Sequence, residues 1–137
     1  MKEEQLLRAW VKLSAMVKNN RITKGLPYNE AIVMMLLAYG EGPISLQEII
    51  RETGMLKSQV NRTVNSLEEK GLLIRCPGEA DKRTQAVRCV EGKMEIFHQV
   101  HQSSMGVAKE IMEIIGKEDT DAFIRIVQKL ADAGYKV

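Results

Sequence analysis

The sequence has little of what disulfide scaffolds and membrane spans are built from. Only two of its 137 residues are cysteines, Cys76 and Cys89. They are too few for a secreted disulfide framework and lack the paired Cys-x-x-Cys spacing of a zinc site. The longest apolar run, residues 31–39, is far shorter than the ~20 residues that a membrane span needs. Residues 1–5 show no signal-peptide pattern, so we expect a soluble, cytoplasmic protein with reduced thiols.

The sequence also lacks the motifs of common enzyme classes. It contains no glycine-rich phosphate loop, HExxH pair, nucleophile elbow or carboxylate pair at catalytic spacing. We therefore expect no catalytic residue, no cofactor and no enzyme activity. The net charge is only +2, but residues 57–88 contain seven basic and four acidic residues, whereas residues 89–137 contain six basic and eight acidic ones. Positive charge is thus concentrated in one segment, where a nucleic acid could bind.

Apolar residues at helical spacing predict long helices at both ends of the chain. The N-terminal stripe runs until Lys24-Gly25, where glycine can close the helix. Its members are Leu6, Trp10, Leu13 and Val17. Near the C-terminus we expect one helix over 93–115 that ends at Gly116, and a last helix capped by Asp119 or Thr120. Both ends carry more apolar surface than one small core covers, which predicts a homodimer.

The middle of the chain has the spacing of a helix-turn-helix. Residues 31–38 are apolar nearly all round, as in a helix at the hub of a core. Ser45-Leu46-Gln47-Glu48 is a capping box for a short helix that ends at Thr53-Gly54. Ser58 can cap the following helix, which closes at Lys70-Gly71. Two short helices joined by a tight turn are therefore expected.

A charged hairpin is predicted directly after this helix pair. Leu72-Leu73-Ile74 starts a strand, a polar loop opens at residues 77–80, and residues 84–89 alternate as a return strand would. The loop carries Asp81-Lys82-Arg83. Such a hairpin is typical of the wing of a winged helix.

The second helix of the pair carries base-reading chemistry on one face. Its inner face is apolar, and its outer face holds Gln59, Asn61, Arg62 and Asn65. Arg62 could pair with guanine O6 and N7, and the three amides could pair with adenine N6 and N7. Phosphate contacts are expected from Lys57, Lys82 and Arg88. The alternative is that this face is only the solvated side of an amphipathic helix.

Taken together, Ser58 to Arg62, residues 67–73 and Asp81-Lys82-Arg83 resemble the MarR family of bacterial transcriptional regulators. The resemblance covers essentially the whole chain. It implies a mainly α fold with a small β-hairpin wing, a winged helix-turn-helix of six helices that dimerises through its N- and C-terminal helices. The implied parts are a dimerisation helix at 1–27, a DNA-binding lobe at 28–92 and dimerisation helices at 93–137.

The resemblance also implies roles for particular residues. It places Ser58, Gln59, Asn61, Arg62 and Asn65 in the major groove. Arg83 would enter the minor groove and Asp81 would orient it. The implied function is a sequence-specific regulator, usually a repressor, that binds a palindromic operator in double-stranded DNA as a homodimer. The sequence departs from the family pattern at Cys89-Val90 and Lys93, so the helix that follows loses its usual cap.

A ligand can switch such a regulator only if it binds two dimer geometries unequally. The expected cleft lies between the dimerisation helices and the DNA-reading lobe. A small aromatic or phenolic ligand would suit its candidate lining residues, Trp10, Tyr28, Tyr39, Met94 and His98. Methionines and aromatics at helical spacing are also common core residues, which is the alternative interpretation.

Two other sensing chemistries stay open, as does a winged helix that binds only protein partners. His98 and His101 lie one turn apart and could bind Zn²⁺ with a third ligand supplied by folding, although a surface or interface pair is the simpler interpretation. Cys76 and Cys89 flank the wing on adjacent strands, so oxidation could cross-link them. Reduced, half-buried thiols are the alternative.

Overall fold

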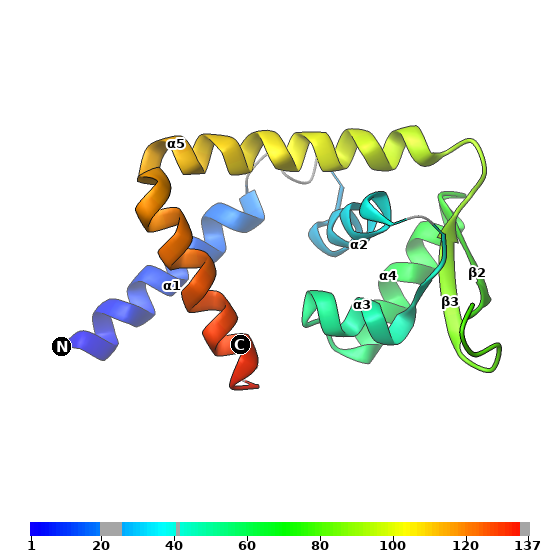
Figure 1. Ribbon diagram of the computed structural model, residues 1–137, viewed down its shortest axis with the longest axis horizontal. Helices are drawn as coiled ribbons and strands as arrows, with labels where there is room; N and C mark the ends of the chain where they lie inside the picture. The colour runs from blue at the N-terminus through cyan, green and yellow to red at the C-terminus, as the bar shows by residue number, and fades with distance from the viewer. Residues whose placement is uncertain (20–25, 41, 135–137) are drawn as a thin grey trace.

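The computed structural model describes residues 1–19, 26–40 and 42–134. Its elements, drawn in Figure 1, are α1 (Lys2–Asn19), α2 (Tyr28–Tyr39), β1 (Ile44–Ser45), α3 (Leu46–Thr53), α4 (Lys57–Glu69), β2 (Leu73–Pro77), β3 (Gln85–Cys89) and α5 (Met94–Asp132). Lys24-Gly25, the predicted end of the first helix, lies outside the described residues. The order of helices and strands is that of a winged helix with a long helix before and after it.

Helix α2 is the hub of the core, as its apolar run predicted. It contacts α3, α4 and α5, and Ala31, Val33 and Met34 are fully buried. Phe97 and Val100 reach the same core from the first part of α5. Glu30, at the start of α2, is buried too, and its carboxylate lies 2.6 Å from Lys70 Nζ at the end of α4. Because a buried charge needs a partner, this ion pair ties α2 to α4.

The helix-turn-helix is made by α3 and α4. Ser45 is the N-cap of α3, and its Oγ accepts a hydrogen bond from the Glu48 backbone N–H at 3.0 Å. Gly54 ends α3 with a left-handed conformation at φ 73°. The prediction that Ser58 caps α4 is wrong, because α4 already begins at Lys57 with Leu56 at the N-cap. A leucine side chain has no atom that can accept a hydrogen bond and cap the helix. Instead, the side chain of Gln59, in the first turn of α4, accepts the Leu56 backbone N–H.

The wing contains one strand more than predicted. The strand order is β1-β3-β2 with antiparallel pairing throughout. In the unpredicted pair, Ile44 lies opposite Val87 and Ser45 opposite Ala86. Two residues are too short to show strand alternation in a sequence, which explains why β1 was missed. Pairing with β1 buries Ala86 and Val87 in succession, so β3 does not alternate cleanly.

The prediction of six helices is wrong: over residues 1–19, 26–40 and 42–134 the structure has five. The two helices expected at the C-terminus form the single element α5, which turns at Gly116 (φ 83°, ψ 172°). Because a glycine can adopt positive φ without strain, one residue changes the direction of the helix and no loop is needed. The break lies at the residue where the first of these helices was predicted to end. The start of α5 lacks a side-chain cap at Lys93, as the departure from the family pattern implied.

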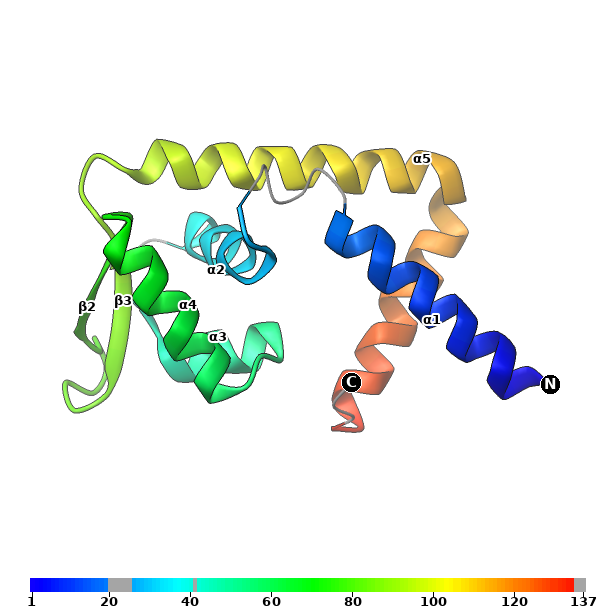
Figure 2. The ribbon, with the colours of Figure 1, turned by 180° about the vertical axis from the view of Figure 1, so that it is seen from behind.

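Helix α1 and the part of α5 beyond Gly116 extend from the same side of the molecule, away from the wing (Figures 1 and 2). We call these two segments the arms, and α2, α3, α4, the sheet and the first part of α5 the lobe. The arms expose large apolar side chains: Leu6, Leu7, Trp10, Val11 and Met16 on α1, and Phe123, Ile124, Ile126, Val127 and Leu130 on α5. Even so, none of the helices that the structure describes is long and apolar enough to cross a membrane.

Candidate nucleic-acid interface

Helix α4 turns its apolar face inward and its polar face outward. Val60, Val64 and Leu67 are buried against the core. Most of the predicted reading residues, namely Lys57, Ser58, Arg62 and Asn65, are exposed, while Gln59 and Asn61 are half-buried. Helix α4 can therefore present these side chains to a partner without disturbing its packing on the lobe.

The three amides of this face already have partners within the protein. Gln59 Oε1 accepts the Leu56 backbone N–H at 2.8 Å. Asn61 Nδ2 donates to the Lys57 carbonyl oxygen at 3.1 Å. Asn65 Oδ1 accepts from the guanidinium of Arg75 at 2.6 Å. Each amide therefore has one polar atom engaged before any DNA is bound, which the sequence did not reveal.

Arg75 is a residue that sequence reasoning missed. It lies on β2, and its guanidinium donates to Asn65 Oδ1 on α4 and to Gln85 Oε1 on β3, the latter at 3.1 Å. Its Nε also lies 3.8 Å from Glu68 Oε1. The contact with Glu68 does have a signal in the sequence. Glu68 and Arg75 carry opposite charges and lie at similar distances on either side of Gly71, where the chain reverses direction and brings them face to face. Arg75 thus connects α4 to both long strands of the wing.

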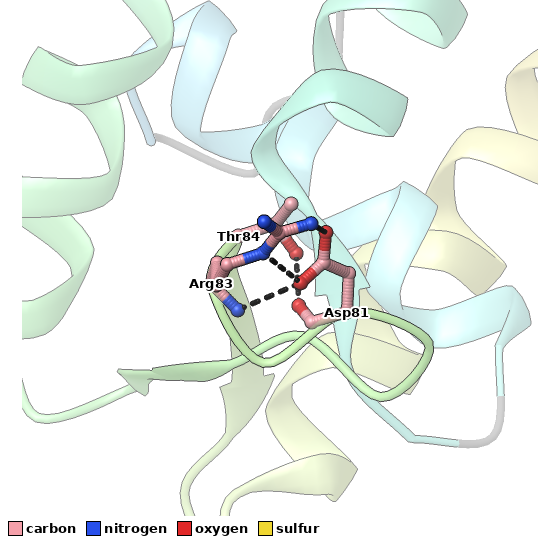
Figure 3. Close-up of polar contacts among 3 residues, drawn as sticks. All are labelled: Asp81, Arg83 and Thr84. Carbon is pink, nitrogen blue, oxygen red and sulfur yellow. Dashed lines mark hydrogen bonds and ion pairs between the residues drawn. The ribbon is translucent and has the colours of Figure 1, made fainter.

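The loop between β2 and β3 is held by its own side chains (Figure 3). Asp81 accepts from Arg83 Nε and Nη2, both at 3.1 Å, and from the Arg83 backbone N–H at 3.0 Å. Thr84 Oγ donates to the Asp81 carbonyl oxygen at 2.6 Å. The Arg83 side-chain contact, and then the backbone one, hold the pKa of Asp81 below its usual value. The carboxylate therefore stays charged and keeps the guanidinium in one orientation.

Gly78 allows this loop to close. Its N–H donates to the Thr84 carbonyl oxygen at 3.0 Å. A Cβ at residue 78 would come within 2.7 Å of the Asp81 carbonyl oxygen and even closer to Thr84 Oγ. Any residue with a side chain at position 78 would therefore displace Asp81 and Thr84, whose contacts hold the loop around Arg83. The Arg83 side chain itself is 91% exposed, at the tip of the hairpin.

The remaining predicted phosphate contacts border the same surface. Lys82 and Arg88 are exposed on the wing. Lys57 and Asn61 line a groove of about 350 Å³ together with Thr84 and Gln85 of the wing. The start of α4 and the loop end of β3 are thus neighbours across one groove.

Comparison with known proteins agrees with this architecture. Residues 24–84 match the sequence model of the MarR family. The matched segment is a little under half of the chain and contains α2, α3, α4 and β2. The chain is 22% identical over 98 residues to the uncharacterized HTH-type transcriptional regulator YwhA of Bacillus subtilis, which covers 72% of this chain and 70% of that relative.

Two solved structures show that the fold is shared over most of the chain. CouR from Rhodococcus jostii, solved with p-coumaroyl-CoA, has a TM-score of 0.76 and 19% identity, and the match covers 88% of this chain and 87% of CouR. BpsR from Bordetella bronchiseptica, whose DNA binding is regulated by 6-hydroxynicotinic acid, has a TM-score of 0.74 and 16% identity over 94% of this chain and 92% of BpsR. At these identities the likeness establishes the winged-helix fold.

The structure does not gather the predicted ligand-binding residues at one place. Tyr28 and Tyr39 are the first and last residues of α2, about 16 Å apart at the helical rise. Met94 packs against the core, His98 is exposed, and Trp10 lies on the α1 arm. A single copy of the chain therefore does not bring these five side chains together in one pocket.

Tyr28 lines a groove of about 600 Å³ between the start of α2 and the turn that joins α3 to α4. Lys18 of α1 and Gln59 of α4 line it as well. Burial raises the pKa of the Tyr28 hydroxyl above its ordinary value, so the hydroxyl is a neutral donor. The groove therefore combines a phenol, an ammonium group and one of the amides of α4.

The two histidines do not form a metal centre with their neighbours. The ring of His101 meets that of Tyr39 edge to face at 4.3 Å, while His98 is exposed. Within the described ranges, no group of three or more His, Cys, Asp or Glu side chains could hold a metal ion. The described residues thus offer the two histidines no third ligand for a zinc site.

The structure favours the reduced thiols expected from the sequence over a cross-link between Cys76 and Cys89. In the register of the sheet, Cys76 lies opposite Ala86 and Cys89 opposite Leu73. An offset of three residues separates the thiols by ~10 Å along the strands, beyond the reach of a disulfide. Burial raises the pKa of the Cys89 thiol despite the opposing effect of Arg88. Cys89 is therefore protonated at neutral pH and a weak nucleophile.

Proposed function

We propose that this chain is a homodimeric transcriptional repressor that binds double-stranded DNA by sequence and responds to a small molecule. The observation that carries the proposal is the pairing of an exposed polar helix face with an arginine held at a hairpin tip, Arg62 on α4 and Arg83 beside Asp81. Helix α4 would enter the major groove and Arg83 the neighbouring minor groove. Such a protein would act in the bacterial cytoplasm.

A homodimer follows from the exposed apolar side chains of the arms. Soluble monomers rarely expose contiguous apolar patches of this extent. Pairing the arms of two copies would bury these side chains and present two α4 helices to the same face of a duplex. Helices one DNA turn apart, ~34 Å, would read the two halves of a palindromic operator.

The groove at Tyr28 supports a ligand-responsive mechanism. Its volume of about 600 Å³ lies in the range of small-molecule sites. Its phenol and the Lys18 ammonium group suit a small aromatic or phenolic acid, and BpsR responds to 6-hydroxynicotinic acid. Since Gln59 lines the groove and belongs to α4, an occupant could change DNA binding directly.

The test is a titration of the protein with DNA from upstream of its own gene, followed by fluorescence anisotropy at two salt concentrations. We expect the logarithm of the binding constant to fall linearly with the logarithm of salt concentration. Arg62→Glu should abolish binding, whereas Lys109→Glu, an equal charge change at an exposed position of α5, should not. Tolerance of Arg62→Glu, or no salt-dependent affinity, would favour a winged helix that binds only proteins.

A further inference from the structure

The amides on the outer face of α4 have fixed orientations. An arginine side chain and a backbone N–H can only donate hydrogen bonds. The atom of Asn65 that faces Arg75, and the atom of Gln59 that faces the Leu56 N–H, must therefore be the carbonyl oxygens. By the same reasoning Asn61 must turn its amide nitrogen to the Lys57 carbonyl oxygen. The orientation of each amide thus follows from its partner, and the amide cannot be flipped without losing the bond.

These orientations decide what each side chain can offer to a base. Arg75 occupies one of the two acceptor sites of Asn65 Oδ1 and leaves the amide nitrogen, a donor, wholly available for DNA, and the Leu56 N–H does the same to Gln59. Asn61 keeps its carbonyl oxygen, an acceptor, wholly available. A paired contact to adenine needs an acceptor for N6 and a donor for N7 in the same side chain. To pair with adenine, Asn65 would have to share Oδ1 between Arg75 and N6.

We propose that Arg75 is a positioning residue that sets base preference, because it fixes the orientation of the Asn65 amide and occupies one acceptor site of Oδ1, so that Asn65 acts mainly as a hydrogen-bond donor. Asn65 would then select an acceptor edge, guanine O6 and N7 or thymine O4, over adenine. This proposal rests on the proposed function of DNA binding. Arg75 itself does not need to touch DNA.

The surroundings of Arg75 hold it in this position. Its side chain is only 27% exposed. Gln85 accepts from Nη1, Asn65 accepts from Nη2, and Glu68 lies beside Nε. The planar guanidinium can satisfy these groups together only in one orientation. A rotation that freed Asn65 would also break the contact to Gln85 on β3.

The experiment selects bound sequences from a random duplex library with four proteins: the parent, Arg75→Met, Asn65→Ala and the double variant. We expect the parent to prefer guanine or thymine at one position of each half-site by about threefold to tenfold, the value of one hydrogen bond. Arg75→Met should shift that position toward adenine because it frees Asn65 Oδ1. The shift should be missing when residue 65 is alanine. The position read by Gln59 should stay unchanged, since its partner is backbone.

A second variant covers the case in which Arg75→Met does not fold, which circular dichroism will show. Asn65→Asp keeps an acceptor for Arg75 but replaces the remaining donor with another acceptor. It should move the preference to cytosine or adenine, whose amino groups donate. The proposal is overturned if Asn65→Asp keeps the parental preference, or if Arg75→Met produces the same shift without Asn65. If the parent protein selects no sequence from the library, the proposed function of sequence-specific DNA binding is wrong, and the role of Arg75 in base preference falls with it.

Discussion

The lobe and the arms differ in how far their apolar side chains are buried. In the lobe, Phe97 and Val64 are completely buried, whereas Leu6 on α1 is 72% exposed and Ile124 on α5 is 61% exposed. The lobe buries its core within one chain, although the end of its α5 segment, before Gly116, also exposes Ile111, Met112 and Ile114. The apolar side chains of the arms have no such core. In the proposed homodimer, folding would depend mainly on the lobe and assembly mainly on the arms.

The largest effect on stability is expected from truncating a buried side chain in the core of the lobe. Phe97→Ala should lower the free energy of unfolding by about 3 to 5 kcal/mol, since it leaves a cavity where α5 meets α2. Urea denaturation monitored by circular dichroism will measure the change at several protein concentrations. A loss that disappears at high concentration would contradict the independence of the lobe.

The arms provide the converse test. Charges placed on both arms, Leu7→Glu with Phe123→Glu, should raise the dimer dissociation constant by more than about tenfold, because unpaired charges are costly to bury. Sedimentation velocity will report the change. Leu56→Glu is the matched control, an exposed leucine of the lobe whose replacement should leave assembly intact. If the parent is already a monomer at micromolar concentration, the division into lobe and arms is wrong.

Base preference should depend on the lobe alone. Arg62→Ala should weaken DNA binding by about 1 to 3 kcal/mol and relax the preference at one base pair. Arg83→Ala should lower affinity more uniformly across sequences. The arm variant should lose affinity without losing preference, because it reduces the number of lobes on the DNA. Anisotropy titrations against a panel of single-base operator variants will separate these three outcomes.

A smaller effect is expected at the contact between α2 and α4. Lys70→Met should destabilise the lobe by about 1 to 2 kcal/mol, because it leaves the buried Glu30 carboxylate without its partner. The double variant with Glu30→Gln should recover part of this loss, measured by urea denaturation. Equal losses in the single and double variants would mean that the lost stability does not come from the unpaired Glu30 carboxylate.

The smallest effect concerns pH at the wing. The pKa of Asp81 is lowered in the folded protein, so its contribution is present above the unfolded value of about 3.9 and is lost as pH falls through the folded value. The wing contact should therefore be unchanged from neutral pH down to about pH 5. A carbon-detected NMR titration of the Asp81 carboxyl group will test this, with Arg83→Ala as the control that returns the pKa to its ordinary value.

Much of this fold follows from patterns that the sequence displays locally. The apolar run of α2, the cap at Ser45 and the glycine at residue 54 each leave a mark within a few residues. What could not be predicted depends on contacts between distant segments. Strand β1 is too short to show alternation, and the offset of Cys76 from Cys89 is set by the register of the sheet.

The candidate site divides in the same way. Sequence reasoning identified the outer face of α4 and the Asp81–Arg83 loop, because both follow from spacing along one element. It missed Arg75, whose importance comes from three partners on two other elements. Sequence reasoning also gave all three amides the same possible contact with adenine, because composition reveals which polar atoms a side chain has but not which of them a neighbour already contacts.

The turn at Gly116 has a geometric consequence for a paired molecule. The part of α5 beyond it, residues 117–132, is about 24 Å long at the helical rise, so a change of about ten degrees at this glycine would move its far end by roughly 4 Å. That displacement is comparable to the rise of one base pair. In the proposed dimer, the backbone conformation at one glycine far from the DNA would thus determine whether the spacing between the two α4 helices matches the helical repeat of the duplex.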